Sequence, residues 1–196
     1  MPYSKVHKAE TRQKILYSAV ELFSRHGFDQ ISIDDLMQHA GLTRGAFYTH
    51  FKNKKSLYAK AIIAGAKKSQ IMNKKPEKLS KEEWTIKLLS GYLSEEHINQ
   101  EISPCPLAFL VSDIANSEDE VQATYTRVFK LLNKTIQAQL KNNPLSTEQN
   151  ILATTAMMIG GVAIGRALNN EAMTAKLLES CQLASLDLLQ LQSNQL

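Results

Sequence analysis

The sequence predicts an all-α protein of about nine helices, on three observations. Apolar residues recur at three- and four-residue spacing along most of the 196-residue chain, as on the buried face of a helix. Serine or threonine followed by acidic residues, the sequence pattern of a helix N-cap, precedes several of these apolar segments. No alternating apolar stretch is followed by a hairpin turn, so no segment is a convincing strand.

The first helix is predicted from about Lys8 to His26. Its apolar positions share one face at the spacing i, i+4, i+7 and i+8, and they are Ile15, Ala19, Leu22 and Phe23. Gly27 follows directly, as expected for a C-terminal cap. This helix is therefore amphipathic and has a defined end.

Two short helices come next. Ser32 precedes a helix predicted over Ile33 to Ala40, and Thr43 precedes a second one over Arg44 to about Phe51. The turn between them is three residues long and contains Gly41. Two short helices joined in this way form a helix-turn-helix.

The remaining helices are predicted from their caps and apolar spacing. A fourth begins after Asn53 and runs to about Met72. The others are expected to begin after Ser80, at Pro106 (ending at Ala115), after Ser117, after Ser146 (ending at about Leu168) and at Glu171 (ending at Leu191).

Positive charge is concentrated in the N-terminal part. Residues 1–78 contain fifteen Lys or Arg and six Asp or Glu, whereas residues 79–196 contain eight and thirteen. A lysine-rich stretch that contains Pro76 separates the two parts. We predict a helix-turn-helix domain over 1–53, a connecting helix and junction over 54–78, and a second helical domain over 79–196. The basic part is expected to meet a polyanion, unless its lysines only form a solvated face.

Composition also narrows the location and the chemistry. The first residues are polar, unlike a secretory signal, and the longest apolar run, residues 156–165, is shorter than the roughly 20 residues of a membrane span. We expect a cytoplasmic protein with no membrane partner. Two cysteines 76 positions apart are expected to be reduced, and no Cys/His spacing suggests zinc, so neither a metal nor a cofactor is expected.

The second helix of the helix-turn-helix carries residue types that read DNA. Arginine can bind guanine through two N–H groups, small residues let the backbone approach the duplex, and lysines at the next helix start can hold a phosphate. The predicted DNA-contacting residues are Ser32, Thr43, Arg44, Gly45, Ala46, Tyr48, Thr49, His50, Lys52, Lys54 and Lys55. The alternative is a helical hairpin that serves only packing, because such hairpins occur in many folds.

Six segments between Thr11 and Lys54 form a specific combination. They are Thr11 to Leu16, Ala19 to Phe23, His26 to Phe28, Ser32 to Leu36, Ala40 to Tyr48 and His50 to Lys54. Together they resemble the DNA-binding domain of TetR-family transcriptional regulators, and the resemblance covers about residues 8–62. It implies that the third helix enters the major groove with Thr43 to Ala46 and Tyr48 to His50 facing DNA, and that Lys54 lies on the backbone.

The same resemblance implies a homodimer whose last two helices form the interface, and an inducer pocket in the C-terminal domain. A helix interior that contains several glycines loses helix propensity, which close approach of another helix would explain. The residues expected at the dimer interface are Gly161, Gly165, Leu178 and Leu186. The alternative is that these glycines pack only within one chain or near a ligand.

Aromatic and sulfur-containing side chains of the C-terminal domain are candidates for the pocket wall. They are Trp84, Tyr92, Cys105, Phe109, Tyr125, Phe129 and Met157. At helical spacing such residues are more often plain core. Cys105 precedes Pro106, so its sulfur is expected at the positive end of a helix dipole, which favours the reactive thiolate. Sensing of electrophiles or oxidants through Cys105 is therefore an alternative to a reversible ligand, and an inert packed thiol is the plainer one.

These observations predict a homodimeric transcriptional regulator, more plausibly a repressor than an activator. Its expected partners are a two-fold DNA operator, a second copy of the chain and a small-molecule effector. No catalytic constellation is visible, so an enzyme is disfavoured. An architectural DNA binder without an effector is a further alternative, which the length of the second domain argues against.

Overall fold

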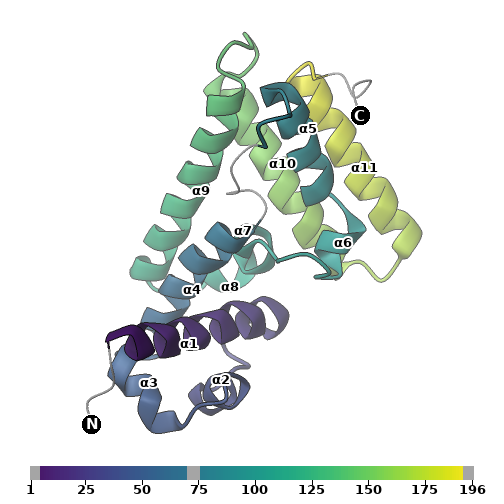
Figure 1. Ribbon diagram of the computed structural model, residues 1–196. Helices are drawn as coiled ribbons and strands as arrows, with labels where there is room; N and C mark the ends of the chain where they lie inside the picture. Colours follow the sequence, from purple (N-terminus) through teal and green to yellow (C-terminus); the bar gives the residue numbers. More distant parts are fainter. Residues whose placement is uncertain (1–4, 70–75, 192–196) are drawn as a thin grey trace.

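The computed structural model describes residues 5–69 and 76–191, and within these ranges it contains eleven helices and no strand (Figure 1). The helices are α1 (Lys5–His26), α2 (Ile33–His39), α3 (Arg44–His50), α4 (Lys54–Lys68), α5 (Lys81–Tyr92), α6 (Glu95–Ile98), α7 (Pro106–Phe109), α8 (Val111–Ala115), α9 (Asp119–Gln139), α10 (Glu148–Ala167) and α11 (Glu171–Leu188). The all-α prediction is confirmed.

Helices α1 to α3 form the head, the lower part of Figure 1. The predicted face of α1 is its buried face, because Ile15, Ala19 and Phe23 are fully buried. Gly27 ends α1 in the left-handed region at φ +79°, and its N–H donates to the Phe23 carbonyl at 2.8 Å. Apolar residues on one stripe thus fix how α1 covers α2 and α3.

Local capping sets the helix starts in and next to the head. The Ser32 hydroxyl accepts from the Asp35 N–H at 3.1 Å, and the Asp35 carboxylate accepts from the Ser32 N–H at 2.8 Å. Asn53 and Ser56 cap α4 in the same reciprocal way. These boxes satisfy backbone N–H groups that have no partner inside the helix, so they set where the chain enters each helix.

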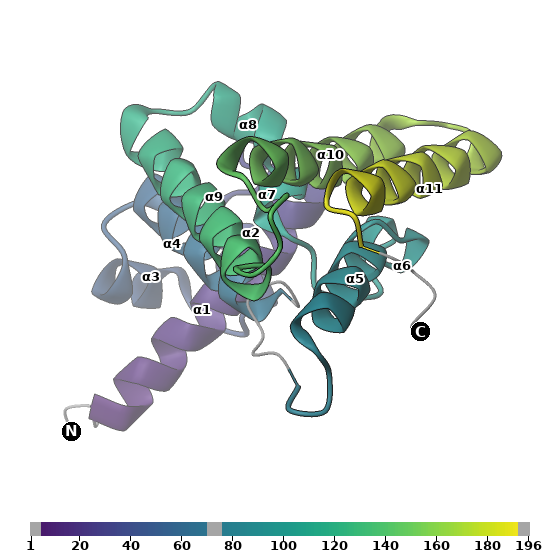
Figure 2. The ribbon, with the colours of Figure 1, turned by 90° about the horizontal axis from the view of Figure 1, so that it is seen from above.

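Helices α5 to α11 form the body, the upper part of Figure 1. Seen from above, α10 and α11 lie side by side along one flank, with α5 below them and α9 on the other flank (Figure 2). The core between these helices includes Leu89, Leu132 and Met158, none of which exposes more than 1% of its surface.

Helix α4 connects the head to the body. It packs against α1 on one side and against α7 and α9 on the other, with Leu57, Tyr58 and Ile62 buried. The end of α4 predicted near Met72 and part of the predicted junction, residues 70–75, lie outside the described residues. A displacement of the body relative to the head would therefore act in large part through the packing of α4.

The body departs from the prediction at two places. The helix expected over Pro106 to Ala115 is two helices, because the backbone leaves helical geometry at Leu110, at φ −119° and ψ 9°. Helix α6 was not expected, since a single turn capped by Ser94 is too short to show a period. Two N-caps also lie one residue later than predicted, at Glu118 and Thr147.

One described helix, Glu148–Ala167, is long and apolar enough to cross a membrane by its length and composition, with a mean hydropathy of 1.2. Such helices are also common in protein cores. Here α10 packs against α7, α9 and α11.

Candidate nucleic-acid interface and buried polar cluster

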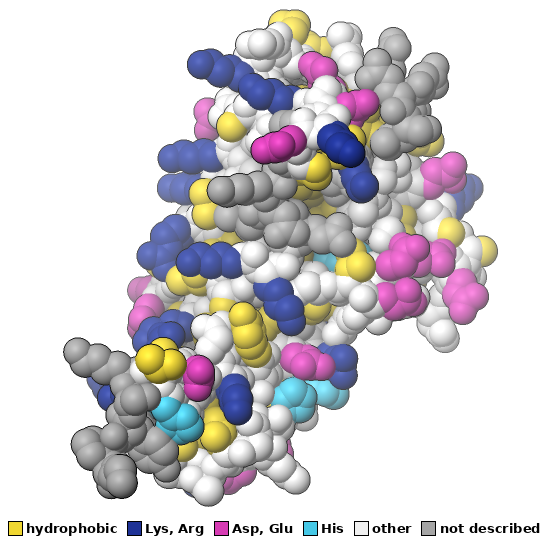
Figure 3. Space-filling view, viewed as in Figure 1, with side chains coloured by type: hydrophobic (Ala, Val, Ile, Leu, Met, Phe, Trp, Pro, Cys, Tyr) yellow, Lys and Arg dark blue, Asp and Glu magenta, His cyan; other side chains and the backbone are white. Residues whose placement is uncertain are grey.

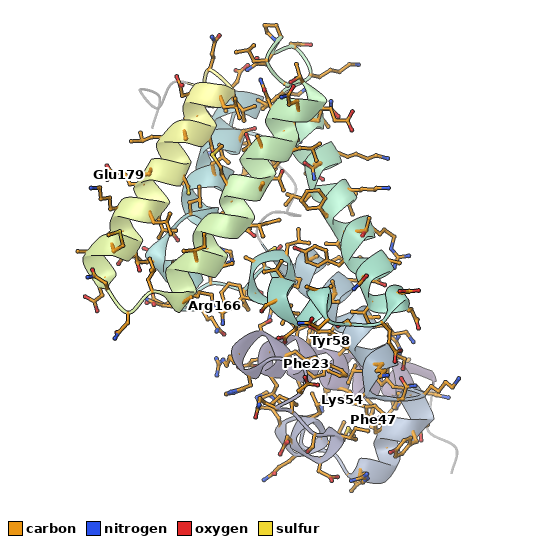
Figure 4. All side chains as sticks on the ribbon, turned by 180° about the vertical axis from the view of Figure 1, so that it is seen from behind. Phe23, Phe47, Lys54, Tyr58, Arg166 and Glu179 are labelled. Atoms are coloured by element: carbon orange, nitrogen blue, oxygen red, sulfur yellow. The ribbon has the colours of Figure 1, made fainter. Side chains whose placement is uncertain are left out.

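Helix α3 is held by aromatic side chains on one face and leaves the other face in solvent. Phe47 is fully buried, and its ring lies 5.8 Å from that of Phe51, which follows the helix. Figure 4 shows Phe47 between the head helices. Tyr48 points outward with 56% of its surface exposed, and Arg44 is also exposed. The packing therefore presents polar side chains on a rigid short helix.

Five of the predicted DNA-contacting residues line one groove of about 480 Å³. They are Thr43, Gly45, Ala46, Thr49 and His50. The opposite wall is the start of α1, with His7, Lys8 and Thr11. The prediction did not include this wall, although the excess of basic residues at the start of the chain was a signal for it.

The charged side chains around α3 differ in whether another described side chain pairs with them. The Arg44 guanidinium pairs with the Asp34 carboxylate of α2, and both side chains are more than half exposed. Lys52 is exposed and makes no ion pair with a described residue. Burial, and then the charges of Lys8 and Arg12, lower the pKa of His50, so its imidazole is neutral at pH 7.

Three predicted contacts already have other partners. The Ser32 hydroxyl belongs to the capping box and also donates to Asp35 at 2.6 Å. The Lys54 ammonium lies 4.1 Å from the centre of the Phe28 ring, and burial lowers its pKa. Lys55 pairs with Glu118 at the start of α9. The structure thus gives Ser32 a capping role, and gives Lys54 and Lys55 contacts outside α3.

The residues predicted for an effector pocket all lie in the body. Trp84, Tyr92, Cys105 and Phe109 are buried, whereas Tyr125, Phe129 and Met157 are partly buried. Only Tyr92 and Cys105 border a common cavity, and its volume is about 20 Å³. That space holds no more than a water molecule, so in this conformation the seven residues act as core.

His97 of α6 organises this cavity, and the sequence analysis did not single it out. Its Nδ1 lies 2.7 Å from the Tyr92 carbonyl oxygen, and its Nε2 accepts from the Cys105 backbone N–H at 3.1 Å. The first contact requires a proton on Nδ1 and the second a free lone pair on Nε2, so the imidazole is neutral. Burial lowers the pKa of His97, which agrees with this assignment.

The side chains of Tyr92, His97 and Cys105 form a buried polar cluster around this cavity. The Tyr92 hydroxyl faces the weakly bonding Cys105 thiol and has no nitrogen or oxygen partner among the described residues. Burial, with a contribution from Cys105, raises the pKa of Tyr92 well above its ordinary value. The Tyr125 hydroxyl, by contrast, donates to the Leu107 carbonyl at 2.8 Å. A buried hydroxyl without a partner costs free energy, so a ligand or water that reached Tyr92 would be favoured.

Cys105 is the N-cap of α7 with Pro106 at the first helical position, as predicted. Its thiol is 1% exposed, and burial raises the pKa of the thiol to about 11, against smaller opposing effects of the Leu107 and Ala108 backbone. Burial therefore outweighs the helix dipole here. The thiol is protonated at neutral pH, which agrees with the inert packed thiol and not with the reactive thiolate considered as its alternative.

We predict that iodoacetamide at pH 7.5 alkylates Cys105 far more slowly than a free thiol, because the reactive thiolate is scarce and the sulfur is covered. A Cys181→Ser variant removes the other cysteine, and peptide mass spectrometry measures the labelled fraction. Unfolding in urea should restore rapid labelling. Labelling of the folded chain at the rate of a free thiol would contradict the buried, protonated state.

The four residues expected at the dimer interface face the interior of the single chain. A Cβ atom on Gly161 would lie 2.9 Å from Leu93 and 3.2 Å from the Cys181 sulfur, and one on Gly165 would lie 2.6 Å from Ile98. Leu178 and Leu186 are buried. These residues pack where α10 contacts α11 and α6 of the same chain. This arrangement corresponds to the alternative in which the glycines pack only within one chain.

Among residues 5–69 and 76–191, no group of three or more His, Cys, Asp or Glu side chains could hold a metal ion.

Comparisons with known proteins agree with this geometry. The family of bacterial regulatory proteins named tetR matches residues 15–61, which include α2, α3 and most of α1. The HTH-type transcriptional regulator AcrR of Shigella flexneri is 45% identical over 56 residues, which are 29% of this chain and 26% of that protein. The chain thus aligns with about a quarter of the length of the first curated relatives.

Two similarities extend through the body. An uncharacterized HTH-type transcriptional regulator, YxaF of Bacillus subtilis, is 25% identical over 177 residues, 87% of this chain and 92% of that protein. The crystal structure of a TetR transcriptional regulator from Chloroflexus aurantiacus has a TM-score of 0.76 at 20% identity, over 94% of this chain and 96% of the other. The latter shows a shared fold of both head and body.

Proposed function

We propose that the protein is a homodimeric, ligand-responsive transcriptional regulator, because residues 15–61 match the tetR family of bacterial regulatory proteins. It acts as a repressor that binds a two-fold DNA operator through α3 of each chain. A small molecule bound in the body releases it.

The observation that carries the proposal is the outward face of α3. Arg44, Tyr48 and Thr49 are exposed, and the helix that bears them is fixed by the fully buried Phe47. An arginine and hydroxyl groups on a rigid short helix suit the base edges and phosphates of a major groove. The start of α1 adds Lys8 and Thr11 on the opposite wall of the groove, where they can contact the DNA backbone.

For the dimer we propose the outward faces of α10 and α11. Exposed large apolar side chains lie on these two adjacent helices, and they are Leu152, Ile164, Met173 and Leu183. Gly160 of α10 has no neighbour within 4 Å of a Cβ atom, so another helix can approach closely there. A two-fold pairing of this face would bury the apolar side chains and present two heads to one operator.

We predict that Ile164→Glu shifts the chain from dimer to monomer, because Ile164 is 53% exposed in the single chain and a carboxylate buried between two copies would be unpaired. Sedimentation equilibrium measures the mass of the particle. Leu131→Glu is the matched control, since Leu131 is 45% exposed on α9, away from the proposed face. A wild-type monomer, or dissociation caused equally by both variants, would contradict the assignment.

For the effector we propose the polar cluster around His97. The Tyr92 hydroxyl supplies a polar group, the His97 ring holds the backbone around it through both ring nitrogens, and Leu88 and Ile102 supply apolar walls of the same cavity. The cavity must widen to admit a ligand. Because α4 packs on both the head and the body, such widening would alter the spacing of the two heads.

Binding to operator DNA in the presence of competitor tests the proposal. Fluorescence anisotropy should show that the chain retains an operator-sized duplex against excess unrelated DNA, and that affinity falls steeply as the salt concentration rises. Equal affinity for all duplexes would leave a sequence-independent binder and would overturn the proposal.

A further inference from the structure

Arg166 at the end of α10 joins the body to the head. Its Nη2 donates to the Ser24 carbonyl of α1 at 3.4 Å, and its Nη1 donates to the Phe109 carbonyl of α7 at 3.3 Å. The guanidinium carbon also lies 3.9 Å from the centre of the Phe109 ring. Figure 4 shows Arg166 at the end of α10 that is nearest the head. Both donor–acceptor distances are longer than is usual for an N–H···O hydrogen bond, so both bonds are weak.

A second contact holds the same end of α1. The Asp113 carboxylate of α8 accepts from the Phe28 backbone N–H at 2.8 Å. A Cβ atom on Gly27 would lie 2.7 Å from that carboxylate oxygen, so the approach requires glycine as well as the positive φ. The last turn of α1 is thus bound to the body through one arginine and one aspartate.

Arg166 also forms part of the wall of an open cavity of about 630 Å³. The cavity lies between α6, the end of α10 and the start of α11, on the other side of α6 from the His97 cluster. Its wall carries two carboxylates, Glu95 and Glu171, beside apolar surface from Ile98 and Leu168. Figure 3 shows acidic side chains gathered over this side of the body, whereas basic ones follow the opposite edge.

The wall therefore offers one cation and two anions to a ligand. A simple anion would meet two carboxylates, and a simple cation would meet the guanidinium. A molecule that carries a carboxylate and an ammonium group a few ångströms apart satisfies both signs, and the apolar surface can take a short side chain. Charge-assisted hydrogen bonds of both kinds are stronger than neutral ones.

We propose that this cavity binds a small zwitterion of the α-amino-acid type, with its carboxylate on Arg166 and its ammonium group on Glu95 and Glu171. Two of the five guanidinium N–H groups are used by the Ser24 and Phe109 carbonyls, and the other three make no hydrogen bond to a described residue. A carboxylate that pairs with the remaining N–H groups draws the guanidinium toward the cavity, and the 3.4 Å bond to Ser24 is the contact that this movement lengthens. Binding therefore loosens the end of α1 from the body.

The consequence for DNA rests on the proposed function. Binding to an operator requires the two heads of a dimer to keep one spacing. Loss of the contact between Arg166 and Ser24 changes the affinity for the operator to the extent that the ligand binds the loosened state more tightly than the intact one. The ligand site itself does not depend on DNA binding.

Isothermal titration calorimetry of the full chain with each of the twenty L-amino acids, without DNA, tests the site. At least one amino acid should bind saturably, and its decarboxylated amine and its deaminated carboxylate should each bind at least about tenfold more weakly. Binding of none of the twenty, or equal binding of either truncated analogue, overturns the proposal.

Variants test the residues. Arg166→Gln and Glu171→Gln should each weaken the amino acid by about tenfold or more, whereas Lys130→Gln, an exposed residue of α9 outside the cavity wall, should leave affinity unchanged. Circular dichroism establishes that each variant is folded, and Glu171→Gln keeps the test decisive if Arg166→Gln unfolds. Unchanged affinity in Glu171→Gln overturns the site.

A final measurement distinguishes binding of the amino acid at the site from its effect on DNA binding. Anisotropy with a selected duplex should show that the amino acid changes wild-type DNA affinity and has no effect on Arg166→Gln. A ligand that binds through Arg166 but leaves the duplex affinity unchanged overturns the coupling. If the chain binds no DNA, the proposed function fails, while calorimetry still decides the site.

Discussion

Arg44→Ala is expected to reduce the discrimination between an operator and a duplex altered at one base pair by about 1–3 kcal/mol. Arg44 is exposed at the first position of α3, and its only ion-pair partner among the described residues is the exposed Asp34. The pair can open without leaving a buried charge, so the guanidinium is available for a base edge. Anisotropy titrations on the operator and on single-site variants measure the difference.

Lys52→Ala is the matched control for Arg44→Ala. Lys52 is exposed and close in sequence to α3, so its ammonium group is expected to contact phosphate and to weaken every duplex alike when removed. Lys54 suits this purpose less well, because its ammonium group lies over the Phe28 ring. If both variants lost affinity equally on all duplexes, the assignment of base reading to Arg44 would be wrong.

Phe23→Ala is expected to lower the free energy of unfolding by about 3–5 kcal/mol. Phe23 is fully buried, and its ring packs edge-on to that of Tyr58 in α4 at 5.0 Å, with Phe28 completing the cluster. Figure 4 shows Phe23 and Tyr58 close together where the head meets the body. Removal of the ring leaves a cavity between α1 and α4, the contact that joins the head to the connecting helix.

Urea unfolding at one fixed chain concentration measures this loss as a lower midpoint, since association of two chains would make stability depend on concentration. Tyr17→Ala is the control, because Tyr17 is an aromatic residue of the same helix that is 49% exposed. It should change stability by less than about 1 kcal/mol. Equal losses in the two variants would mean that the α1–α4 aromatic cluster is not the element that stabilises the head.

The head could be predicted closely because its signals are local. Ser32 and Gly27 define the ends of helices through bonds to residues three or four positions away. The buried face of α1 follows from spacing alone, and the exposed side of α3 follows from the positions of Phe47 and Phe51. These features need no knowledge of the rest of the chain.

The body was predicted less completely because contacts between distant residues decide it. The break at Leu110 has no local signal, since the sequence from Leu107 to Ala115 contains neither glycine nor proline. Gly161 and Gly165 indicated a close approach of helices, but their spacing could not say that the partners are Cys181 and Ile98 of the same chain. The sequence pattern identified the tight contact and not its partner.

The functional side chains show the same difference between features set by nearby residues and features set by distant ones. The position of Lys55 shortly after α3 in the sequence predicted a phosphate contact. In the structure its ammonium group pairs with Glu118, 63 positions away. His97 gave no motif, because its role depends on a carbonyl five residues before it and an N–H eight residues after it. Arg166 meets Ser24 across 142 positions, a contact that only the assembled fold reveals.

Selection of bound duplexes from a random pool, followed by a mass measurement of the complex, tests whether two chains bind one two-fold DNA site. We expect the selected sites to be inverted repeats with half-sites about one helical turn apart, and each duplex to carry two chains. Selected sites without two-fold symmetry, or a complex with a single chain, would contradict this expectation.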